Sequence, residues 1–225
     1  MVAALTDGGS TDPRPVDRTA VRRLPGKQVR DRTALDEVLD SGRVAHLAVV
    51  DAGQPYVLPV AYARLGDEVL VHGSTASRLF RTLAAGAPTC LTVTVLDGLV
   101  AARSVFESSM RYRSAMVLGC ARPLDGDSKL AALERITEHL LPGRWAEARR
   151  PSRKEMAATT VLALPLHEWS VKVSAGHPDD AAADLDLPVW AGVVPLQEVA
   201  GEPIPAPDLR VRMPVPAYVR TWARR

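Results

Sequence analysis

The chain has 225 residues, with 28 lysines and arginines against 26 aspartates and glutamates, so its formal net charge is +2. This length is sufficient for one large domain or two small domains with a buried core. Hydrophobic residues make up 47% of the chain and charged residues 24%, which excludes a disordered chain. No apolar run reaches the roughly 20 residues that cross a bilayer, and the amino-terminal segment lacks the pattern of a secretory signal.

The two cysteines, Cys90 and Cys120, are too few for a disulfide framework and are not spaced as metal ligands. Both lie in apolar runs, so we interpret them as reduced thiols in the core of a cytoplasmic protein. The histidines are scattered, and no set of His, Cys, Asp and Glu has the spacing of a metal site. No G-x-S-x-G motif or nucleophile–base pair indicates a hydrolase.

The basic residues are concentrated at the two ends of the chain. Residues 13–32 hold seven basic and two acidic side chains, and residues 209–225 hold five arginines and no acid. Such ends could contact a nucleic acid or another anionic partner. No helix-turn-helix, zinc spacing or aromatic-interleaved basic patch supports nucleic acid, so we favour arms that aid solubility or contact another subunit.

The first half of the chain is predicted to hold a short helix and a meander of strands. Residues 34–41 are expected to form the helix, with Thr33 as its cap and Gly42 as its stop. Alternating apolar residues and short turns then predict three strands, at 44–50, 55–62 and 68–71. Strands joined by short turns pair antiparallel, which argues against a Rossmann sheet.

The second half continues with two helices and further short strands. Apolar residues at helical spacing predict one helix that begins near Ala76 and ends before Gly86, and another from residue 127 or 128 to residue 140. A hairpin turn is expected at residues 97–98. The remaining strands are expected at 89–95, 99–105, 114–121, 159–164 and 169–173.

This element order predicts a mainly β fold, a Greek-key β-barrel with peripheral helices. We divide the chain into three parts by composition and pattern. These are a basic N-terminal arm at 1–32, the barrel domain at 33–176, and a proline-rich C-terminal extension at 177–225 that packs on the barrel or on a partner subunit.

Residues 71–78 (VHGSTASR) are the first candidate site. A strand ends at His72, a turn of small residues follows, and a helix begins. Backbone N–H groups at that helix start, the hydroxyl groups and the Arg78 guanidinium could converge on one phosphate. An ordinary Ser/Thr helix cap with a surface arginine explains the same residues.

Residues 102–114 (ARSVFESSMRYRS) are the second candidate. Three arginines, four serines and bulky apolar groups stand close together between two predicted strands. Such a segment could bind an anionic aromatic ligand through charge, hydrogen bonds and stacking. A polar hairpin or a strand at a subunit interface is the alternative interpretation.

Together these segments resemble a known family. QPYVLPVAY at 54–62, VHGS at 71–74 with Ser77 and Arg78, and LTVT at 91–94 are similar to the pyridoxamine 5′-phosphate oxidase-like flavoproteins. The resemblance is strongest to their flavin-nucleotide-binding branch, which includes the nitroimidazole-resistance proteins. It extends over about residues 21–219 through DGLVAARS at 97–104, SM at 109–110, YRS at 112–114, PGR at 142–144 and PVWAGVVP at 188–195.

The resemblance implies an FMN-binding split barrel that forms a homodimer, with FMN in the cleft between the subunits. One group would flank the isoalloxazine ring, namely Leu58, Pro59, Val60, Ala61 and Tyr62. A second group would hold the ribityl phosphate, namely His72, Gly73, Ser74, Ser77 and Arg78. A third group would contribute to the same pocket from its own chain or the partner's, namely Ser109, Met110, Arg113 and Ser114. By the same resemblance, His72 is the candidate catalytic residue.

Two positions depart from this branch, which commonly has histidine in place of Glu107 and asparagine in place of Arg111. These departures alter the charge of the pocket if both side chains face it. We find no convincing counterpart of the residues that bind the substrate in true pyridoxamine phosphate oxidases.

The leading hypothesis is therefore an FMN-dependent oxidoreductase that transfers a hydride to or from a small organic substrate. One alternative is a flavin- or haem-binding carrier or sensor without turnover. Another is a split-barrel reductase with a deazaflavin cosubstrate, whose acidic tail would meet the basic arms.

Overall fold

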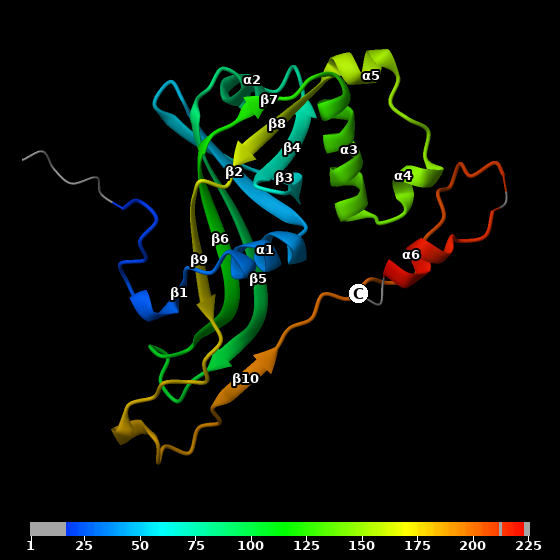
Figure 1. Cartoon of the computed structure of the whole chain (residues 1–225). Helices are drawn as coiled ribbons and strands as arrows, with labels where there is room; N and C mark the ends of the chain where they lie inside the picture. The colour runs from blue at the N-terminus through cyan, green and yellow to red at the C-terminus, as the bar shows by residue number, and fades with distance from the viewer. Residues whose placement is uncertain (1–16, 212, 223–225) are drawn as a thin grey trace, which may run out of the picture.

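The computed structural model describes residues 17–211 and 213–222, and its centre is one large sheet (Figure 1). The strand order is β1-β9-β6-β5-β2-β3-β4-β8-β7, and β10 pairs with β5. Neighbouring strands in this sheet run antiparallel, which confirms the predicted mainly β fold with helices outside it. The strands are β1 (Gln28–Val29), β2 (Val44–Asp51), β3 (Gln54–Leu65), β4 (Glu68–Ser74), β5 (Pro88–Ala101), β6 (Ser109–Cys120), β7 (Arg122–Pro123), β8 (Thr159–Pro165), β9 (Glu168–Ser174) and β10 (Gly192–Pro195).

The helices are short, apart from α3, and two single 3₁₀ turns lie at Pro25–Lys27 and Ala182–Asp184. The side chain of Asp31 caps α1 by accepting a hydrogen bond from the Thr33 N–H at 3.0 Å. The predicted Thr33 cap is therefore wrong, because the carboxylate two residues earlier satisfies that N–H group. The α-helices are α1 (Arg32–Ser41), α2 (Arg78–Ala84), α3 (Gly126–Leu140), α4 (Arg144–Glu147), α5 (Arg153–Ala158) and α6 (Ala217–Trp222).

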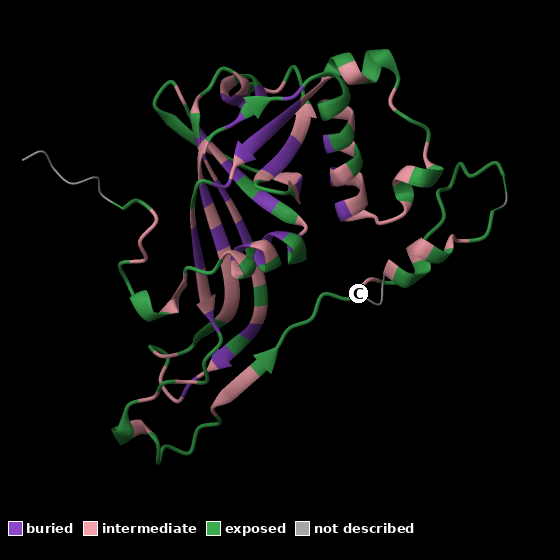
Figure 2. Ribbon diagram, in the orientation of Figure 1, coloured by how far each residue is buried: buried purple, intermediate pink, exposed green. Residues whose placement is uncertain are grey.

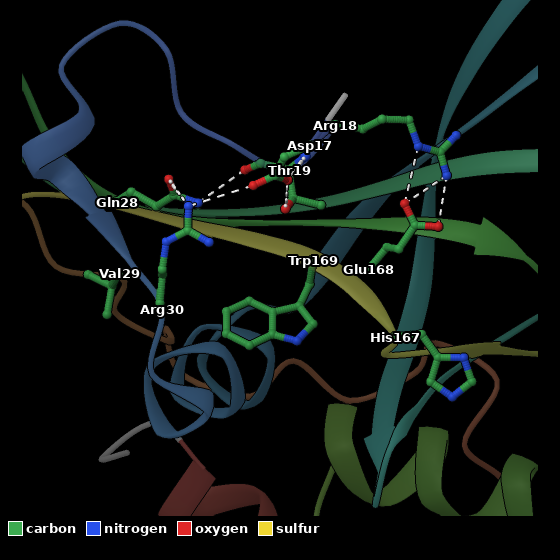
Figure 3. A pocket seen from close by; sticks show the side chains of 9 residues that line it. All are labelled: Asp17, Arg18, Thr19, Gln28, Val29, Arg30, His167, Glu168 and Trp169. Carbon is green, nitrogen blue, oxygen red and sulfur yellow. Dashed lines mark hydrogen bonds and ion pairs between the residues drawn. The ribbon is translucent and has the colours of Figure 1, made fainter. Parts of the chain in front are cut away.

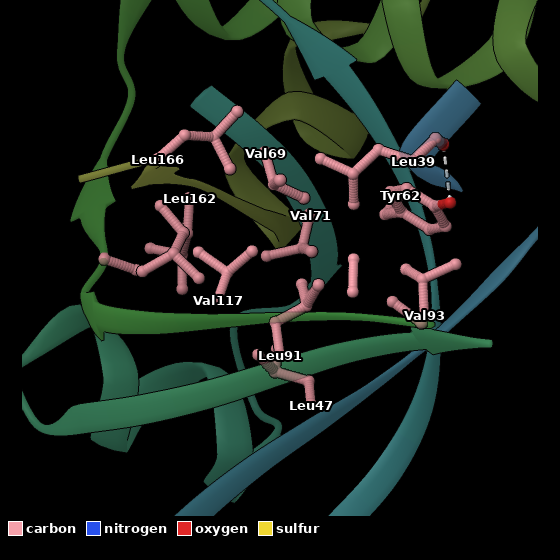
Figure 4. Packing of buried hydrophobic residues seen from close by; sticks show 14 of the residues in the cluster. Leu39, Leu47, Tyr62, Val69, Val71, Leu91, Val93, Val117, Leu162 and Leu166 are labelled. Atoms are coloured by element: carbon pink, nitrogen blue, oxygen red, sulfur yellow. Dashed lines mark hydrogen bonds between the residues drawn. The ribbon is translucent and has the colours of Figure 1, made fainter. Parts of the chain in front are cut away.

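Two apolar clusters hold the sheet and the helices together. The larger cluster fills the inside of the curved sheet, where Figure 4 shows Leu39 of α1 beside Tyr62 of β3. Leu35 and Val38 of the same helix are also buried in this cluster. Burial of each such side chain contributes about 1.5–3 kcal/mol. The smaller cluster joins α3, through Ala132 and Ile136, to the other face of β3, β4 and β8. Figure 2 shows this concentration of buried residues in the sheet and in the helix faces turned toward it.

The hairpin expected at residues 97–98 is wrong, because β5 runs through this point as one strand to Ala101. The pairing with β6 shifts between Leu96 and Gly98, so the glycine marks a bulge. Gly98 also faces the backbone of β10. A Cβ atom at Gly98 would lie 2.9 Å from the carbonyl oxygen of Val194, so the glycine permits this close approach.

Both ends of the chain add strands that were not predicted. Residues 28–29 of the arm pair with β9, and the arm is held further by Arg18, which donates two nitrogens to the Glu168 carboxylate at 2.7–3.1 Å. Figure 3 shows the small cavity that results, ≈350 Å³ in volume, where Arg30 and Asp17 also form an ion pair. At the other end, β10 extends the sheet from the proline-rich C-terminal extension.

The cysteines differ from the prediction of two core thiols. Cys90 is half-buried, but Cys120 is exposed because it is the last residue of β6, at the end of the sheet. Burial raises the pKa of the Cys90 thiol, so this side chain is a poor nucleophile at neutral pH. Within the described ranges, no helix is long and apolar enough to span a membrane.

Candidate functional site

The segment between β4 and α2 contains the predicted phosphate-binding residues. The turn is closed by hydrogen bonds from the Ser77 N–H to the Ser74 carbonyl at 3.0 Å and from the Ala76 N–H to the Ser74 hydroxyl at 3.2 Å. Ser77 occupies the N-cap position of α2, but its hydroxyl group makes no capping hydrogen bond. The Ser77 hydroxyl therefore remains available to a ligand.

Arg78 extends from this turn toward β3. Its guanidinium lies over the ring of Tyr56, 4.2 Å from the centroid, and Nη1 donates to the Tyr56 hydroxyl at 3.1 Å. Nε lies 3.9 Å from a carboxylate oxygen of Asp51, and the Arg78 side chain is 58% exposed. Sequence reasoning missed this support, although Tyr56 stands within the QPYVLPVAY motif. The contacts orient the guanidinium while leaving Nη2 without a partner in the described part of the chain.

His72 lies near the carboxyl end of β4, where it pairs with Val161 of β8. Its Nδ1 atom is buried and has no hydrogen-bond partner among the residues described. Burial lowers the pKa of the imidazole, so the ring is neutral at physiological pH. A neutral imidazole with an unpartnered nitrogen can accept a proton or bind a metal ion, and a polar ligand would satisfy it.

Gly73 has a packing role that the sequence did not reveal. A Cβ atom at this position would lie 2.2 Å from the ring of Phe80, which α2 places against β4. The absence of a side chain at Gly73 therefore allows the helix to pack on the strand.

The residues expected along the isoalloxazine ring divide into accessible and buried ones. Leu58 and Pro59 are exposed, and Val60 and Ala61 are half-buried. Tyr62 is completely buried, and its hydroxyl donates to the Leu39 carbonyl at 2.6 Å (Figure 4). The prediction that the Tyr62 side chain flanks a ring is therefore wrong, because packing against α1 removes it from any accessible surface.

The third predicted group lies on β6, where Ser109 and Met110 are exposed and Arg113 and Ser114 are half-buried. Arg113 is not a free cation. Its Nε and Nη2 donate to the two carboxylate oxygens of Asp97 at 3.0 and 2.9 Å, and these bonds raise the pKa of the guanidinium. Arg103, one of the three arginines of the second candidate segment, pairs with Asp180 of the C-terminal segment.

The sheet order keeps these groups apart within one chain. Arg78, His72 and the accessible part of β3 lie on neighbouring elements, whereas β6 is separated from β3 by β5 and β2. The structure thus brings together the first two predicted groups and leaves the third at a distance.

A second and larger cavity, ≈780 Å³ in volume, was not anticipated. It lies between the start of β2, the middle of β5 and the segment that follows β10. Arg113 is the only predicted site residue that lines it, and His46 is its only histidine. No cluster of His, Cys, Asp and Glu suited to a metal ion occurs in the part of the chain that the structure describes.

Comparison with known proteins identifies the fold family. The family model described as pyridoxamine 5′-phosphate oxidase matches residues 31–173. The chain belongs to this family. The antiparallel sheet is thus the split barrel typical of the family's members. No curated protein matches the chain.

Three solved structures are similar to the chain. The FAD and haem binding protein from Mycobacterium smegmatis shares 46% identity over 88% of this chain and 97% of its own, with a TM-score of 0.84. The flavocytochrome Anf3 from Azotobacter vinelandii shares 37% identity over 92% of this chain and 97% of its own, with a TM-score of 0.85. In both, the similarity extends beyond residues 31–173.

The third structure is described as a putative 5-nitroimidazole antibiotic resistance protein from Bacteroides thetaiotaomicron. It shares 19% identity over 65% of this chain and 86% of its own, with a TM-score of 0.54. At this identity the likeness shows the fold alone.

Proposed function

We propose that this chain is a cytoplasmic flavin- and haem-binding redox protein, in which the flavin exchanges a hydride with a small organic molecule. The observation that carries the proposal is the similarity to the Mycobacterium smegmatis protein, 46% identical over 88% of this chain, which is described as binding FAD and haem. The resemblance of the sequence motifs implies FMN, whereas that protein is described as binding FAD. Both lines of evidence therefore point to a flavin nucleotide.

The described residues fit a flavin. Arg78 offers a positive charge that is oriented by Tyr56 and open to solvent, as a phosphate anchor requires. Leu58 and Pro59 are exposed apolar residues on opposite faces of β3, and a flat ring could pack against either face. His72 provides a neutral imidazole with an unpartnered nitrogen. A bound flavin would supply the two-electron chemistry that the side chains lack.

In this proposal each side chain has a defined task. The guanidinium of Arg78 and the hydroxyl groups of Ser74 and Ser77 hold the phosphate, and the accessible residues of β3 orient the ring and exclude water. His72 accepts or returns the proton that accompanies hydride transfer, because its imidazole stays neutral near pH 7.

We further propose that the site is completed in a homodimer. Within one chain, β5 and β2 lie between β3 and the strand β6 that carries Ser109, Met110, Arg113 and Ser114. A second copy would bring its own β6 to the ring. The exposed apolar residues on these strands, Leu58 and Met110 among them, support such a contact.

Purification of the full chain and its visible spectrum test the proposal. A yellow or red protein is expected, and chromatography of the group released by denaturation separates FAD from FMN. A colourless protein that takes up neither flavin nor hemin would contradict the proposal. The alternative of a reductase with a deazaflavin cosubstrate would then remain. Rapid-mixing reduction by NADH or NADPH, followed by reoxidation with candidate acceptors, then distinguishes an enzyme from a carrier.

A further inference from the structure

The larger cavity has two unlike walls. One wall is the face of the sheet that points away from the main core. The other wall is the segment after β10 together with Trp222 of α6, which we call the tail wall. The sheet contributes Val44, His46, Thr94, Val95 and Leu96, together with the ion pair of Asp97 and Arg113. The tail wall contributes Leu196, Gln197, Glu198, Val199, Ala200 and Trp222, and Ser41, Gly42 and Arg43 complete the lining just before β2.

The alternation of β2 places His46 in this cavity. Ala45 and Leu47 point into the core and are fully buried, so the residues between and beside them face the opposite side. His46 lies opposite Pro59 on β3 and Thr92 on β5. Its ring has no hydrogen-bond partner in the ranges that the structure describes, so both nitrogens are available.

The tail wall is anchored to the rest of the fold. The Leu196 N–H donates to the Asp97 carbonyl at 3.1 Å, which continues the pairing of β10 with β5. The Trp222 indole N–H donates to the Leu140 carbonyl at 2.8 Å. Arg43 lies over the Trp222 ring, 5.6 Å from its centroid, and forms no ion pair with a described carboxylate. Arg43 thus lines the cavity without a carboxylate partner among the described residues.

These features fit one class of ligand. The volume of ≈780 Å³ lies in the range of cofactor sites. A large flat apolar ligand would bury the leucines and valines of both walls, a carboxylate on it would pair with Arg43, and a metal ion at its centre would take the imidazole of His46. An iron porphyrin combines all three properties.

We propose that this cavity binds haem, with His46 as an axial ligand and Arg43 paired with a propionate. The inference rests on the proposed function, because the presence of haem is suggested by the two similar proteins. The position of the haem is inferred from the cavity, His46 and Arg43 of this chain. The tail wall lies outside residues 31–173, whereas the similarity to both haem-linked structures extends beyond that range.

Three other described histidines, His139, His167 and His72, lie in less suitable surroundings. The Nε2 atom of His139 lies 2.8 Å from the Gly42 carbonyl, to which it donates, and the ring is buried. His167 lines the small cavity near the arm, where the charged groups are already paired. His72 lies on β4, beyond β3 from His46, and belongs to the proposed flavin site.

The test is a titration of the purified full chain with hemin, followed in the visible spectrum. We expect saturable binding at one haem per chain. His46→Ala should weaken binding roughly tenfold or more and change the Soret band, and added imidazole should restore the band. Arg43→Glu should weaken hemin binding without changing flavin affinity. His167→Ala, a surface histidine away from the cavity, serves as the matched control.

The outcomes separate this inference from the proposed function. If wild type binds hemin and His46→Ala binds it with the same affinity and spectrum, the assignment is overturned. If His72→Ala fails to develop the Soret band on addition of hemin while His46→Ala develops it as wild type does, the assignment is overturned. The axial ligand would then be His72 of β4. If wild type binds neither flavin nor hemin, the proposed function itself fails.

Discussion

The carboxylate of Asp180 accepts three hydrogen bonds from the start of the loop that follows β5. The donors are the Arg103 N–H at 2.8 Å, the Arg103 Nη1 at 3.0 Å and the Ser104 N–H at 3.3 Å. The Asp180 side chain is only 1% exposed. The C-terminal segment therefore fixes a loop whose tip, with Phe106 86% exposed, leads directly into the predicted site residues of β6.

Replacement of this carboxylate should loosen the loop. Desolvation raises the pKa of Asp180, but the hydrogen bonds from Arg103 and Ser104 outweigh it and hold the pKa below its ordinary value. The carboxylate thus stabilises the fold at neutral pH, and this contribution is lost as pH falls through the lowered pKa. We expect Asp180→Asn to lower Tm at pH 7 and to weaken flavin binding, with a smaller Tm difference from wild type in acid. An unchanged flavin Kd would show that the loop does not contribute to the site.

Gly73→Ala tests the contact between β4 and α2. The new Cβ would lie 2.2 Å from the Phe80 ring, so the helix must move or the ring must leave its position. We expect a loss of about 1–3 kcal/mol in the free energy of unfolding, measured by urea denaturation. Phe80→Leu should recover part of that loss in the Gly73→Ala background. Equal stability of Gly73→Ala and wild type would contradict the packing role.

Arg78→Ala tests the phosphate anchor. Removal of one charged hydrogen-bond donor should weaken binding of FMN or FAD by about 10- to 100-fold. Binding of lumiflavin, which has the ring but no phosphate, should change little. Tyr56→Phe is the matched control, because it removes the hydroxyl that accepts from Arg78 and keeps the ring beneath the guanidinium. A flavin affinity unaffected by Arg78→Ala would remove this arginine from the site.

His139 should make stability depend on pH. Burial lowers the pKa of its imidazole despite the hydrogen bond to the Gly42 carbonyl, so the unfolded chain takes up the proton at higher pH than the folded chain does. The stabilisation is complete above the unfolded pKa of about 6.5 and decreases as pH falls below it. Urea denaturation between about pH 8 and pH 5 should show this decrease, and His139→Gln should reduce it. Burial also lowers the pKa of His72, so His72→Gln should likewise reduce the decrease in stability at low pH.

Local patterns predicted much of the fold because they reflect local physics. The apolar spacing from Leu130 to Leu140 gave a helix that α3 confirms, and alternation predicted β2 with an error of one residue. The dipeptide Asp97–Gly98 misled us, because it is a common hairpin turn and here forms a bulge. Only the return of residues 192–195 to this strand explains its glycine, and a partner so distant in sequence leaves no local pattern.

The site could be predicted less completely than the fold. The motif around Arg78 indicated an anion site, but its support by Tyr56 and Asp51 depends on how the β2–β3 hairpin meets α2. Tyr62 stands in the same motif as Leu58, yet packing against α1 buries one and leaves the other exposed. His46 is one of the scattered histidines, and only the position of the tail wall gives it a cavity to face.

The close approach of Val194 to Gly98 also has a consequence for related sequences. Any side chain at this position would meet the tail backbone at a distance that real Cβ atoms essentially never show. In a relative of this chain with valine or isoleucine at this position, the tail could not pair with the sheet as an additional strand in the same way. The residue at this position therefore indicates, from sequence alone, which family members can pair their tail with β5 and enclose a second cavity beside the barrel.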